Sequence, residues 1–386
     1  MPEDSPLESR IRARLASLQS QGLLRSLNAP AGIDLCSNDY LNLSRDPRLV
    51  ARIVEGATRE GCGSTGSRLL RGERECFAAV EQRFARFKGT ERSLYFGAGY
   101  LANVGVLTTL AEEGDVVFSD ERNHASLIDG TRLSRARTVI FPHNDSGTLQ
   151  RLLSGTTTNG LRFIAVESLF SMDGDVAPLA EYAAIARSTG AALIVDEAHA
   201  VGIYGANGTG LIEAAGVAGD VCVSINTAGK ALGVSGAFVA GPAWAIEYLV
   251  QRARPFVFST APPPALADAL DASLSIVEEE PERRERLLAR AAFLRARLTA
   301  AGVSVADGYS QILPIVLGDN ERAVAVACVL QHEGFDVRAI RPPSVPAGTA
   351  RLRVSVNAGL SEGVLDQFVA TLSAALKEID LCAASS

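Results

Sequence analysis

Apolar residues follow two alternating patterns along most of the chain. From about residue 75, stretches with helical spacing of apolar residues are followed by short apolar runs typical of buried strands. The clearest unit has a strand in LRFIAVES, a helix in APLAEYAAIARSTG that begins near Pro178 and ends at Gly190, and a strand in AALIVDEAHA. Strands joined by helices in this way predict an α/β fold with a parallel sheet.

The two ends of the chain have different patterns. Residues 7–27 carry apolar residues at near-helical spacing and predict an N-terminal helix that leads into an extended segment. Residues 266–300 predict two charged amphipathic helices divided near Pro281, and strands and helices alternate in the remainder. We therefore expect an N-terminal helix and extended segment at 1–44 that joins the small domain, a large domain at 45–275 and a small α+β domain at 276–386.

Composition restricts the possible functions. The 386 residues are 47% hydrophobic, which is enough for a large core, and the formal charge of −7 gives no support to nucleic-acid or anionic-membrane binding. Six cysteines are scattered without a C-x-x-C pair, so neither a metal site nor a disulfide framework is indicated. The N-terminus lacks an apolar signal segment and no window approaches a membrane span, so we expect a cytoplasmic protein.

One lysine has unusual surroundings. Lys230 stands in SINTAGKALGVSGAFV, between two predicted interior strands, and is flanked by small residues that allow backbone to approach a ligand closely. Most lysines are simply exposed at the surface. A desolvated amine with few neighbours, however, is the usual nucleophile for a carbonyl group, with which it forms a Schiff base. Lys230 is therefore a candidate catalytic residue.

A second group of polar residues ends a predicted strand. VDEAH places Asp196 and His199 at the carboxyl edge of the sheet, where ligands bind in such folds. Asp196 could instead cap the next helix, and the strand alone leaves both interpretations open. Together with Lys230, Asp196 supplies the two anchors that pyridoxal 5′-phosphate requires: a carboxylate for the pyridine nitrogen and an amine for the aldehyde.

Two further motifs fit the same cofactor. FGAGYLAN places Gly99 at the start of a helix whose free N–H groups could receive a phosphate, although such turns are common. His124 lies in DERNHASLIDG and could stack on a pyridinium ring or move a proton. His143 and His332 are interpreted as structural histidines, and GCGSTGSR as a substrate or interface loop.

These motifs, in this order, resemble those of the α-oxoamine synthases, which use pyridoxal phosphate and have the aspartate-aminotransferase type of fold. The resemblance spans nearly the whole chain, from CSNDYLNLS through NHASLIDG, ESLFSMDGDVAPL and VDEAHAVGIYGANGTG to GKALGVSGA and RPPSVPAGTARLR. It implies fold type I: a large domain with a mixed, mostly parallel seven-stranded sheet, and a smaller α+β domain. It also implies a homodimer with active sites at the interface.

The resemblance implies a role for each cofactor contact. Lys230 would hold the cofactor as a Schiff base and later act as the base at the α-carbon. Asp196 would pair with the pyridine nitrogen and His124 would stack on the ring face. His199 and Ser171 would hydrogen-bond the ring oxygen.

The phosphate contacts come from three other positions. Gly99 and Tyr100 would offer backbone N–H groups, and Thr227 would offer its hydroxyl. The chain departs from the family at Ala98, where a serine is frequent, and at Phe77, where many relatives have a histidine. These departures affect the expected substrate more than the expected cofactor.

Substrate contacts are implied on the same basis. Arg353 would hold the carboxylate of the amino acid, and Arg25 and Ser344 would lie along the path of the acyl substrate. Asn38 and Glu167 would complete the site.

The motifs HNDSGTLQRLL, FSMDGDVAPLAE and AIRPPSVPAGTARLR are most similar to the biotin-pathway branch of the family. This similarity implies decarboxylative condensation of L-alanine with a pimeloyl thioester, carried on coenzyme A or an acyl carrier protein. Glycine C-acetyltransferase, 5-aminolevulinate synthase and serine palmitoyltransferase share the cofactor residues and remain alternatives. A non-catalytic protein with the same fold is a more distant alternative.

Overall fold

The computed structural model describes residues 5–384, which divide into two compact units. The large unit comprises residues 38–171 and 175–287, and the small unit comprises the described residues up to Ser37 together with 172–174 and 288–384. The division therefore falls after Ser37 and Leu287, whereas the sequence suggested boundaries after residues 44 and 275. The change of unit after Leu287 falls within one continuous helix, α12 (Pro281–Ala300).

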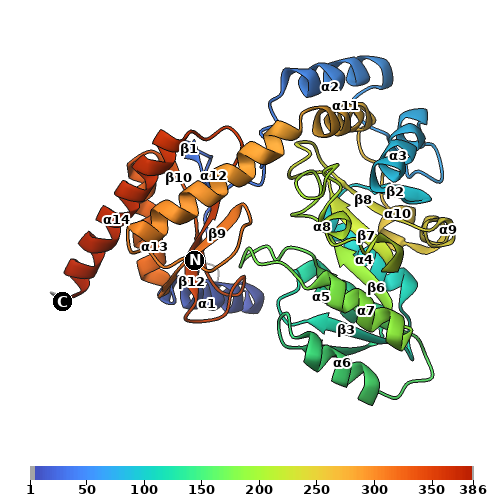
Figure 1. The fold of residues 1–386 in the computed structure, drawn as a ribbon, viewed down its shortest axis with the longest axis horizontal. Coiled ribbons are helices and arrows are strands. Elements are labelled where there is room, and N and C mark those ends of the chain that lie inside the picture. Colours follow the sequence, from blue (N-terminus) through green and yellow to red (C-terminus); the bar gives the residue numbers. More distant parts are fainter. Residues whose placement is uncertain (1–4, 385–386) are drawn as a thin grey trace. The chain divides into compact units, whose positions relative to one another are not determined.

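The large unit is built on a seven-stranded sheet with the strand order β2-β8-β7-β6-β5-β3-β4 (Figure 1). Strand β8 is antiparallel to both of its neighbours, and all other neighbouring strands are parallel. The mixed, mostly parallel sheet expected from the resemblance is thus confirmed. The strands are β2 (Arg92–Phe96), β3 (Val116–Asp120), β4 (Arg137–Phe141), β5 (Arg162–Glu167), β6 (Ala192–Asp196), β7 (Val221–Thr227) and β8 (Ala237–Gly241).

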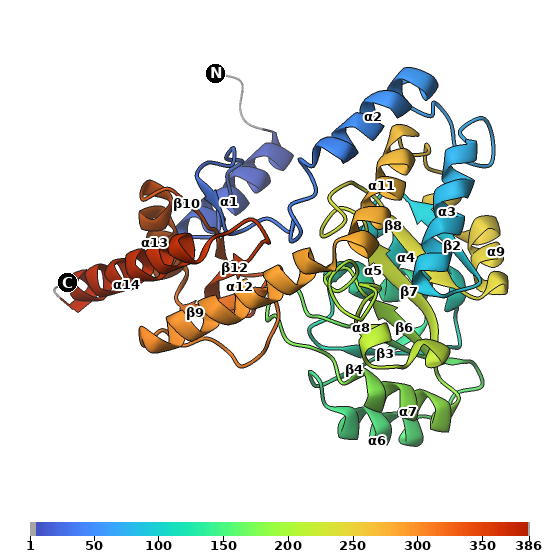
Figure 2. The ribbon, with the colours of Figure 1, turned by 45° about the horizontal axis from the view of Figure 1, so that its top comes forward.

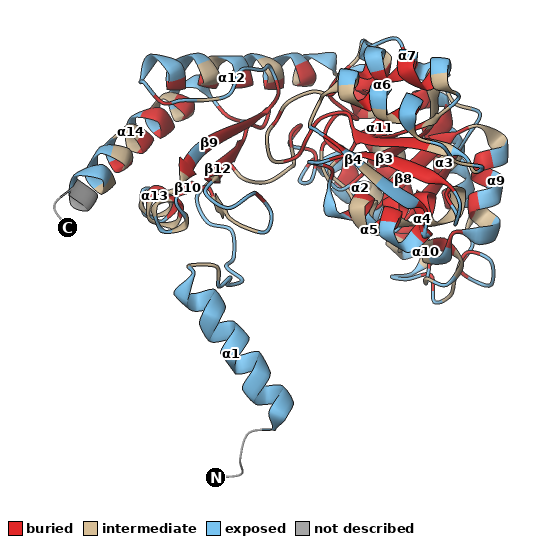
Figure 3. Ribbon diagram, turned by 90° about the horizontal axis from the view of Figure 1, so that it is seen from below, coloured by how far each residue is buried: buried red, intermediate tan, exposed pale blue. Residues whose placement is uncertain are grey.

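Helices cover both faces of this sheet, and its strands are largely buried (Figure 3). On one face Val223 and Ile225 of β7 share a core cluster with residues of α4, whereas on the other Phe238 of β8 stacks on Phe84 of α3 at 4.1 Å. Helices α2 and α11 lie side by side (Figures 1 and 2). The helices are α2 (Pro47–Glu60), α3 (Glu75–Lys88), α4 (Gly99–Leu110), α5 (Ala125–Ser134), α6 (Ser146–Gly155), α7 (Leu179–Thr189), α8 (Leu211–Ala214), α9 (Ala243–Arg252), α10 (Arg254–Val257) and α11 (Ala265–Glu279).

The local signals in the sequence account for several element ends. The β5–α7–β6 unit forms as predicted, with Pro178 at the N-cap of α7 and Gly190 at its C-cap in the left-handed conformation, at φ 69°. The N-terminal helix, α1, is shorter than predicted and covers Pro6–Ser20. The chain leaves the helix at Gly22, whose φ of 64° glycine adopts without strain.

The small unit has two sheets of its own. Strands β11 (Ala339–Ile340), β12 (Ala350–Ser355) and β9 (Ile312–Gly318) form an antiparallel sheet, and β1 (Ile33–Asp34) pairs in parallel with β10 (Phe335–Asp336). Its other helices are α13 (Asn320–His332) and α14 (Glu362–Ala384). Within residues 5–384, none of the helices has both the length and the apolar character needed to cross a bilayer.

Candidate active site

Three neighbouring strands of the large unit end at the same edge of the sheet. Glu167 of β5 is the register partner of Asp196 of β6, and Asp196 is the partner of Ile225, two residues before the end of β7 at Thr227. Because these strands are parallel, their carboxyl ends meet there, as the sequence predicted for Glu167 and Asp196. The segment that follows β7 carries Lys230 along the same edge.

Lys230 contacts a buried histidine. Its Nζ lies 2.6 Å from Nε2 of His199, and Nδ1 of His199 lies 2.7 Å from the hydroxyl of Tyr40. The Tyr40 hydroxyl donates its hydrogen to Oδ1 of Asn38 at 2.8 Å, so Nδ1 of His199 is the donor to Tyr40. Nε2 of His199 is then free of hydrogen and accepts from the amine of Lys230.

Sequence reasoning missed Tyr40. The residue is completely buried and lies 159 positions from His199 along the chain. Its place in the motif CSNDYLNLS was the only signal, and that motif does not indicate which side chain the phenol contacts.

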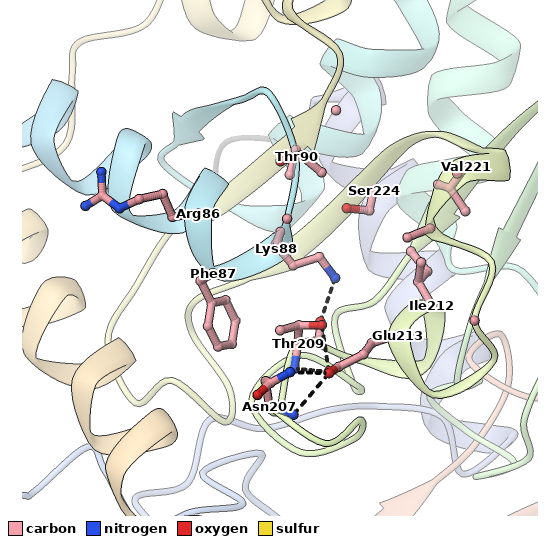
Figure 4. A pocket seen from close by; sticks show the side chains of 16 residues that line it. Arg86, Phe87, Lys88, Thr90, Asn207, Thr209, Ile212, Glu213, Val221 and Ser224 are labelled. Atoms are coloured by element: carbon pink, nitrogen blue, oxygen red, sulfur yellow. Dashed lines mark hydrogen bonds between the residues drawn. The ribbon is translucent and has the colours of Figure 1, made fainter.

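The chain contains three lysines, Lys88, Lys230 and Lys377. Lys88 lines a pocket of about 490 Å³ near the start of β7 and the end of β8 (Figure 4). Its ammonium is buried, 2.5 Å from Oε2 of Glu197 and 2.6 Å from the carbonyl of Thr209. Lys377 is exposed on α14. Of the three, Lys230 alone lies on the segment that follows β7, where its amine contacts His199.

Asp196 is 5% exposed and oriented by two hydrogen bonds. Its Oδ1 accepts from the backbone N–H of Ala198 at 2.8 Å, and its Oδ2 accepts from the amide of Asn103 at 2.6 Å. Carboxylate oxygens accept more than one hydrogen bond each, so Asp196 retains capacity for a further N–H donor. This is the property that a pyridine nitrogen requires of its partner.

His124 is the N-cap of α5, where its Nδ1 accepts the backbone N–H of Ser126. Although the residue is exposed, surrounding protein lowers the pKa of its imidazole by loss of hydration. The charge of Asp196 opposes this effect on the pKa, and the charge of Lys230 adds to it. An exposed imidazole that stays neutral suits the stacking role expected of it.

Glu167 connects two of the expected site residues. It is 3% exposed and accepts the backbone N–H of His124 at 2.6 Å, and also that of Ser171. Burial, and then the neighbouring charge of Asp196, raise the pKa of Glu167 to about 8. The side chain therefore holds two loops together, and its raised pKa favours the protonated form.

The start of α4 fits a phosphate. Its N-cap residue, Ala98, makes no side-chain hydrogen bond to the helix, so that no side chain caps the N–H groups of the first turn. A Cβ placed on Gly99 would lie 2.5 Å from Oγ1 of Thr227, which shows how closely that hydroxyl approaches the helix. Helix N-termini and hydroxyl donors favour phosphate groups. Together with Lys230 and Asp196, these donors form a set that fits pyridoxal phosphate.

The remaining predicted residues have other surroundings. Arg25, Ser344 and Arg353 belong to the small unit, and their roles as substrate contacts stay predictions. Arg353 is 6% exposed and donates to Oγ of Ser355 at 2.7 Å. Arg25 and Ser344 are exposed. The hydroxyl of Tyr100, whose backbone was expected at the phosphate, donates to Oδ2 of Asp129 at 2.5 Å.

The chain is similar to known proteins over nearly its whole length. The model of the family Aminotransferase class I and II matches residues 30–372. An 8-amino-7-oxononanoate synthase from Anaeromyxobacter dehalogenans is 48% identical over 384 residues, 96% of each chain. The protein of the same name from Geobacter sulfurreducens is 45% identical and covers 96% of this chain and 99% of its own.

Solved structures give the same grouping. A serine palmitoyltransferase variant from S. paucimobilis, with bound PLP and myriocin, has a TM-score of 0.91 at 30% identity and covers 98% of this chain and 100% of its own. An 8-amino-7-oxononanoate synthase from Francisella tularensis has a TM-score of 0.79 at 30% identity, over 90% of this chain and 98% of its own.

Proposed function

The chain belongs to the aminotransferase class I and II family, and we propose that it condenses L-alanine with a pimeloyl thioester to form 8-amino-7-oxononanoate. It is an enzyme that uses pyridoxal phosphate, an acyltransferase of the α-oxoamine synthase type acting in biotin biosynthesis. The observation that carries the proposal is the contact between Lys230 and His199 at the strand edge that also presents Asp196. The choice of substrates rests on the two curated relatives.

When bound, pyridoxal phosphate withdraws electrons from the α-carbon of an amino acid and makes its proton acidic. In this proposal Lys230 would hold the cofactor aldehyde, and its amine would be the base that takes the α-proton of alanine. His199 would keep that amine in place through Nε2, and Asp196 would hold a proton on the pyridine nitrogen. A general base within reach of its proton contributes about 10²–10⁴ in rate.

The overall reaction requires two proton transfers at the α-carbon of alanine. A bond forms between the α-carbon of alanine and the carbonyl carbon of the thioester, and the carbon–sulfur bond breaks to release the thiol. The carboxylate of alanine leaves as carbon dioxide, and the α-carbon takes up a proton. Lys230 is the group proposed to remove the first proton and return the second.

Other features of the proposed function rest on the resemblance to the family. The homodimer, with sites formed at its interface, follows from resemblance to the family, as do the substrate roles of Arg353, Arg25, Ser344 and Asn38. The thioester is carried by coenzyme A or by an acyl carrier protein, and the reaction takes place in the cytoplasm.

Product analysis tests the proposal. Purified protein with pyridoxal phosphate is incubated with one thioester (pimeloyl-CoA, pimeloyl-carrier protein or acetyl-CoA). Each incubation also contains one amino acid: alanine, glycine or serine. Of the three amino acids, we expect only alanine to give release of carbon dioxide and a product with the mass of 8-amino-7-oxononanoate. Turnover restricted to glycine and acetyl-CoA would instead assign the chain to a sister enzyme. A protein that binds no cofactor would support the non-catalytic alternative.

A further inference from the structure

A buried amide connects two of the expected cofactor contacts. Asn103 lies on α4 and is 2% exposed. Its Nδ2 is 2.6 Å from Oδ2 of Asp196 and 2.9 Å from Oγ of Ser126. Both hydrogens of the amide group therefore have an acceptor, one on each side of the site.

The direction of these hydrogen bonds is determined by Asp196. If the amide of Asn103 were turned over, its oxygen would face a carboxylate oxygen at 2.6 Å, and two acceptors would repel each other. Oδ1 of Asn103 has no hydrogen-bond partner within the described part of the chain. An unsatisfied buried oxygen destabilises a fold. The observed orientation of the amide therefore pairs both N–H groups even though it leaves the oxygen without a hydrogen bond.

The donor-to-acceptor direction of the hydrogen bonds continues from Asn103 through Ser126 to His124. Oγ of Ser126 accepts from Asn103, which leaves its single hydrogen for another acceptor, and Nδ1 of His124 lies 2.7 Å away. The backbone N–H of Ser126 points to the same Nδ1 at 3.2 Å. Nδ1 of His124 is thus an acceptor from two donors, and the neutral imidazole must carry its hydrogen on Nε2.

We propose that Asn103 is a positioning residue that couples Asp196 to His124 through Ser126 and holds the imidazole of His124 in the Nε2–H form. This inference rests on the cofactor site in the proposed function but not on the choice of substrates. It assigns one amide group to orient both the carboxylate expected at the ring nitrogen and the imidazole expected on the ring face.

A second buried asparagine provides a matched control. Asn226 of β7 is fully buried, donates from Nδ2 to Oγ of Ser224 at 2.9 Å and has an Oδ1 without a partner in the described residues. Asn226 therefore resembles Asn103 in its burial, in its donation to a serine hydroxyl and in its unpartnered amide oxygen, but not in the contact with Asp196. Because side chains alternate along a strand, Asn226 faces away from the side of the sheet that Ile225 shares with α4.

Nitrogen NMR of the cofactor-free protein tests the inference directly. The chain has four histidines, so ¹⁵N-histidine labelling gives few signals, and a His124→Gln sample assigns the relevant one. In the wild-type protein we expect His124 in the Nε2–H form. A His124 that carries its hydrogen on Nδ1 overturns the proposal, whatever the substrates prove to be.

Two variants then isolate the contribution of Asn103. In Asn103→Leu, and in the smaller Asn103→Ala, we expect the His124 signals to move toward a mixture of the two forms. The dissociation constant for pyridoxal phosphate should rise about tenfold, which is the loss of one hydrogen bond to a charged group. Asn226→Leu should leave both readouts unchanged. Unaltered His124 signals in a folded Asn103 variant, or equal changes in the Asn226 variant, contradict the proposal.

Discussion

Nζ of Lys230 lies 2.6 Å from Nε2 of His199, and the hydrogen on the opposite nitrogen of that imidazole is directed to Tyr40. The imidazole is therefore fixed from both sides, with its acceptor nitrogen toward the lysine. A flexible lysine with a directed partner loses fewer productive orientations than one that moves freely in solvent. Under the proposed function, Tyr40 and His199 would therefore position the amine of Lys230.

Tyr40→Phe removes the hydroxyl that holds His199 and leaves the aromatic ring in place. We expect kcat to fall about tenfold, because the net value of such a hydrogen bond is about 1 kcal/mol. Steady-state kinetics with saturating substrates measures the change. Tyr182→Phe is the control, since Tyr182 is equally buried and its hydroxyl has no hydrogen-bond partner in residues 5–384. Equal losses in both variants would assign Tyr40 to packing alone.

Gly99→Ala tests the phosphate site. The added Cβ would lie 2.5 Å from Oγ1 of Thr227 and would displace the hydroxyl expected at the phosphate. We expect the dissociation constant for pyridoxal phosphate to rise at least tenfold, or about 1.4 kcal/mol, in a fluorescence titration. In Gly97→Ala the Cβ would meet Cγ of Pro262 at an ordinary 3.8 Å, so its affinity should match the wild-type protein. Wild-type affinity in the Gly99 variant would place the phosphate elsewhere.

Glu167 should make the free energy of unfolding depend on pH. Its pKa is about 8 in the folded protein and near 4.5 in the unfolded chain, so the folded state retains a proton that the unfolded state loses between these values. Stability should therefore fall as pH rises from 4.5 to 8. Glu167→Gln should remove ~2–4 kcal/mol of this dependence, because an amide oxygen still accepts the N–H of His124 without titrating.

Urea denaturation of the cofactor-free protein between pH 5 and 8.5 measures this effect. The comparison variant is Glu333→Gln, at a carboxylate that is exposed at the end of α13. Parallel stability curves for the wild-type protein and the Glu167 variant would show that Glu167 is ionised throughout this range.

His143 should stabilise the fold at low pH and lose this contribution as the pH rises. Burial opposes its charge, but hydrogen bonds to Asp120, at 2.9 Å, and to Asp175 outweigh burial and raise the pKa of His143 to about 9. A histidine with a raised pKa stabilises the fold fully below its unfolded pKa near 6.5, and this contribution disappears as pH rises through 9. The structural role inferred for this histidine from the sequence agrees with these two contacts.

His143→Gln should therefore destabilise the protein by ~1–2 kcal/mol at pH 6, after allowance for partial solvent screening, and by much less at pH 10. Thermal unfolding at the two pH values tests the difference. His332→Gln, at a side chain that is 88% exposed, should have no such effect. A loss of stability at His143 that is equal at pH 6 and pH 10 would mean that the imidazole is uncharged.

Local patterns predicted much of the fold, because helix spacing and glycine caps act over a few residues. The β5–α7–β6 unit, the α3 end at Gly89 and the division between α11 and α12 all follow from such signals. The strand order does not, since the antiparallel strand β8 lies between β2 and β7 through contacts distant in sequence.

The same limit applies to the site. Lys230, Asp196 and His199 could be proposed as site residues because each stands in a motif with recognisable chemistry. Asn103 contacts Asp196 across 93 positions, and an asparagine on an apolar helix has no distinctive local pattern. Only the three-dimensional structure shows that its amide serves two site residues at once.

Covalent trapping tests the central claim most directly. The protein is incubated with pyridoxal phosphate and treated with borohydride, which reduces an imine to a stable amine, and the peptides are analysed by mass spectrometry. With three lysines in the chain, the possible sites are few. We predict that the pyridoxyl group is found on Lys230 and on neither Lys88 nor Lys377. Label on either of those lysines with Lys230 unmodified, or no label at all, would contradict the account.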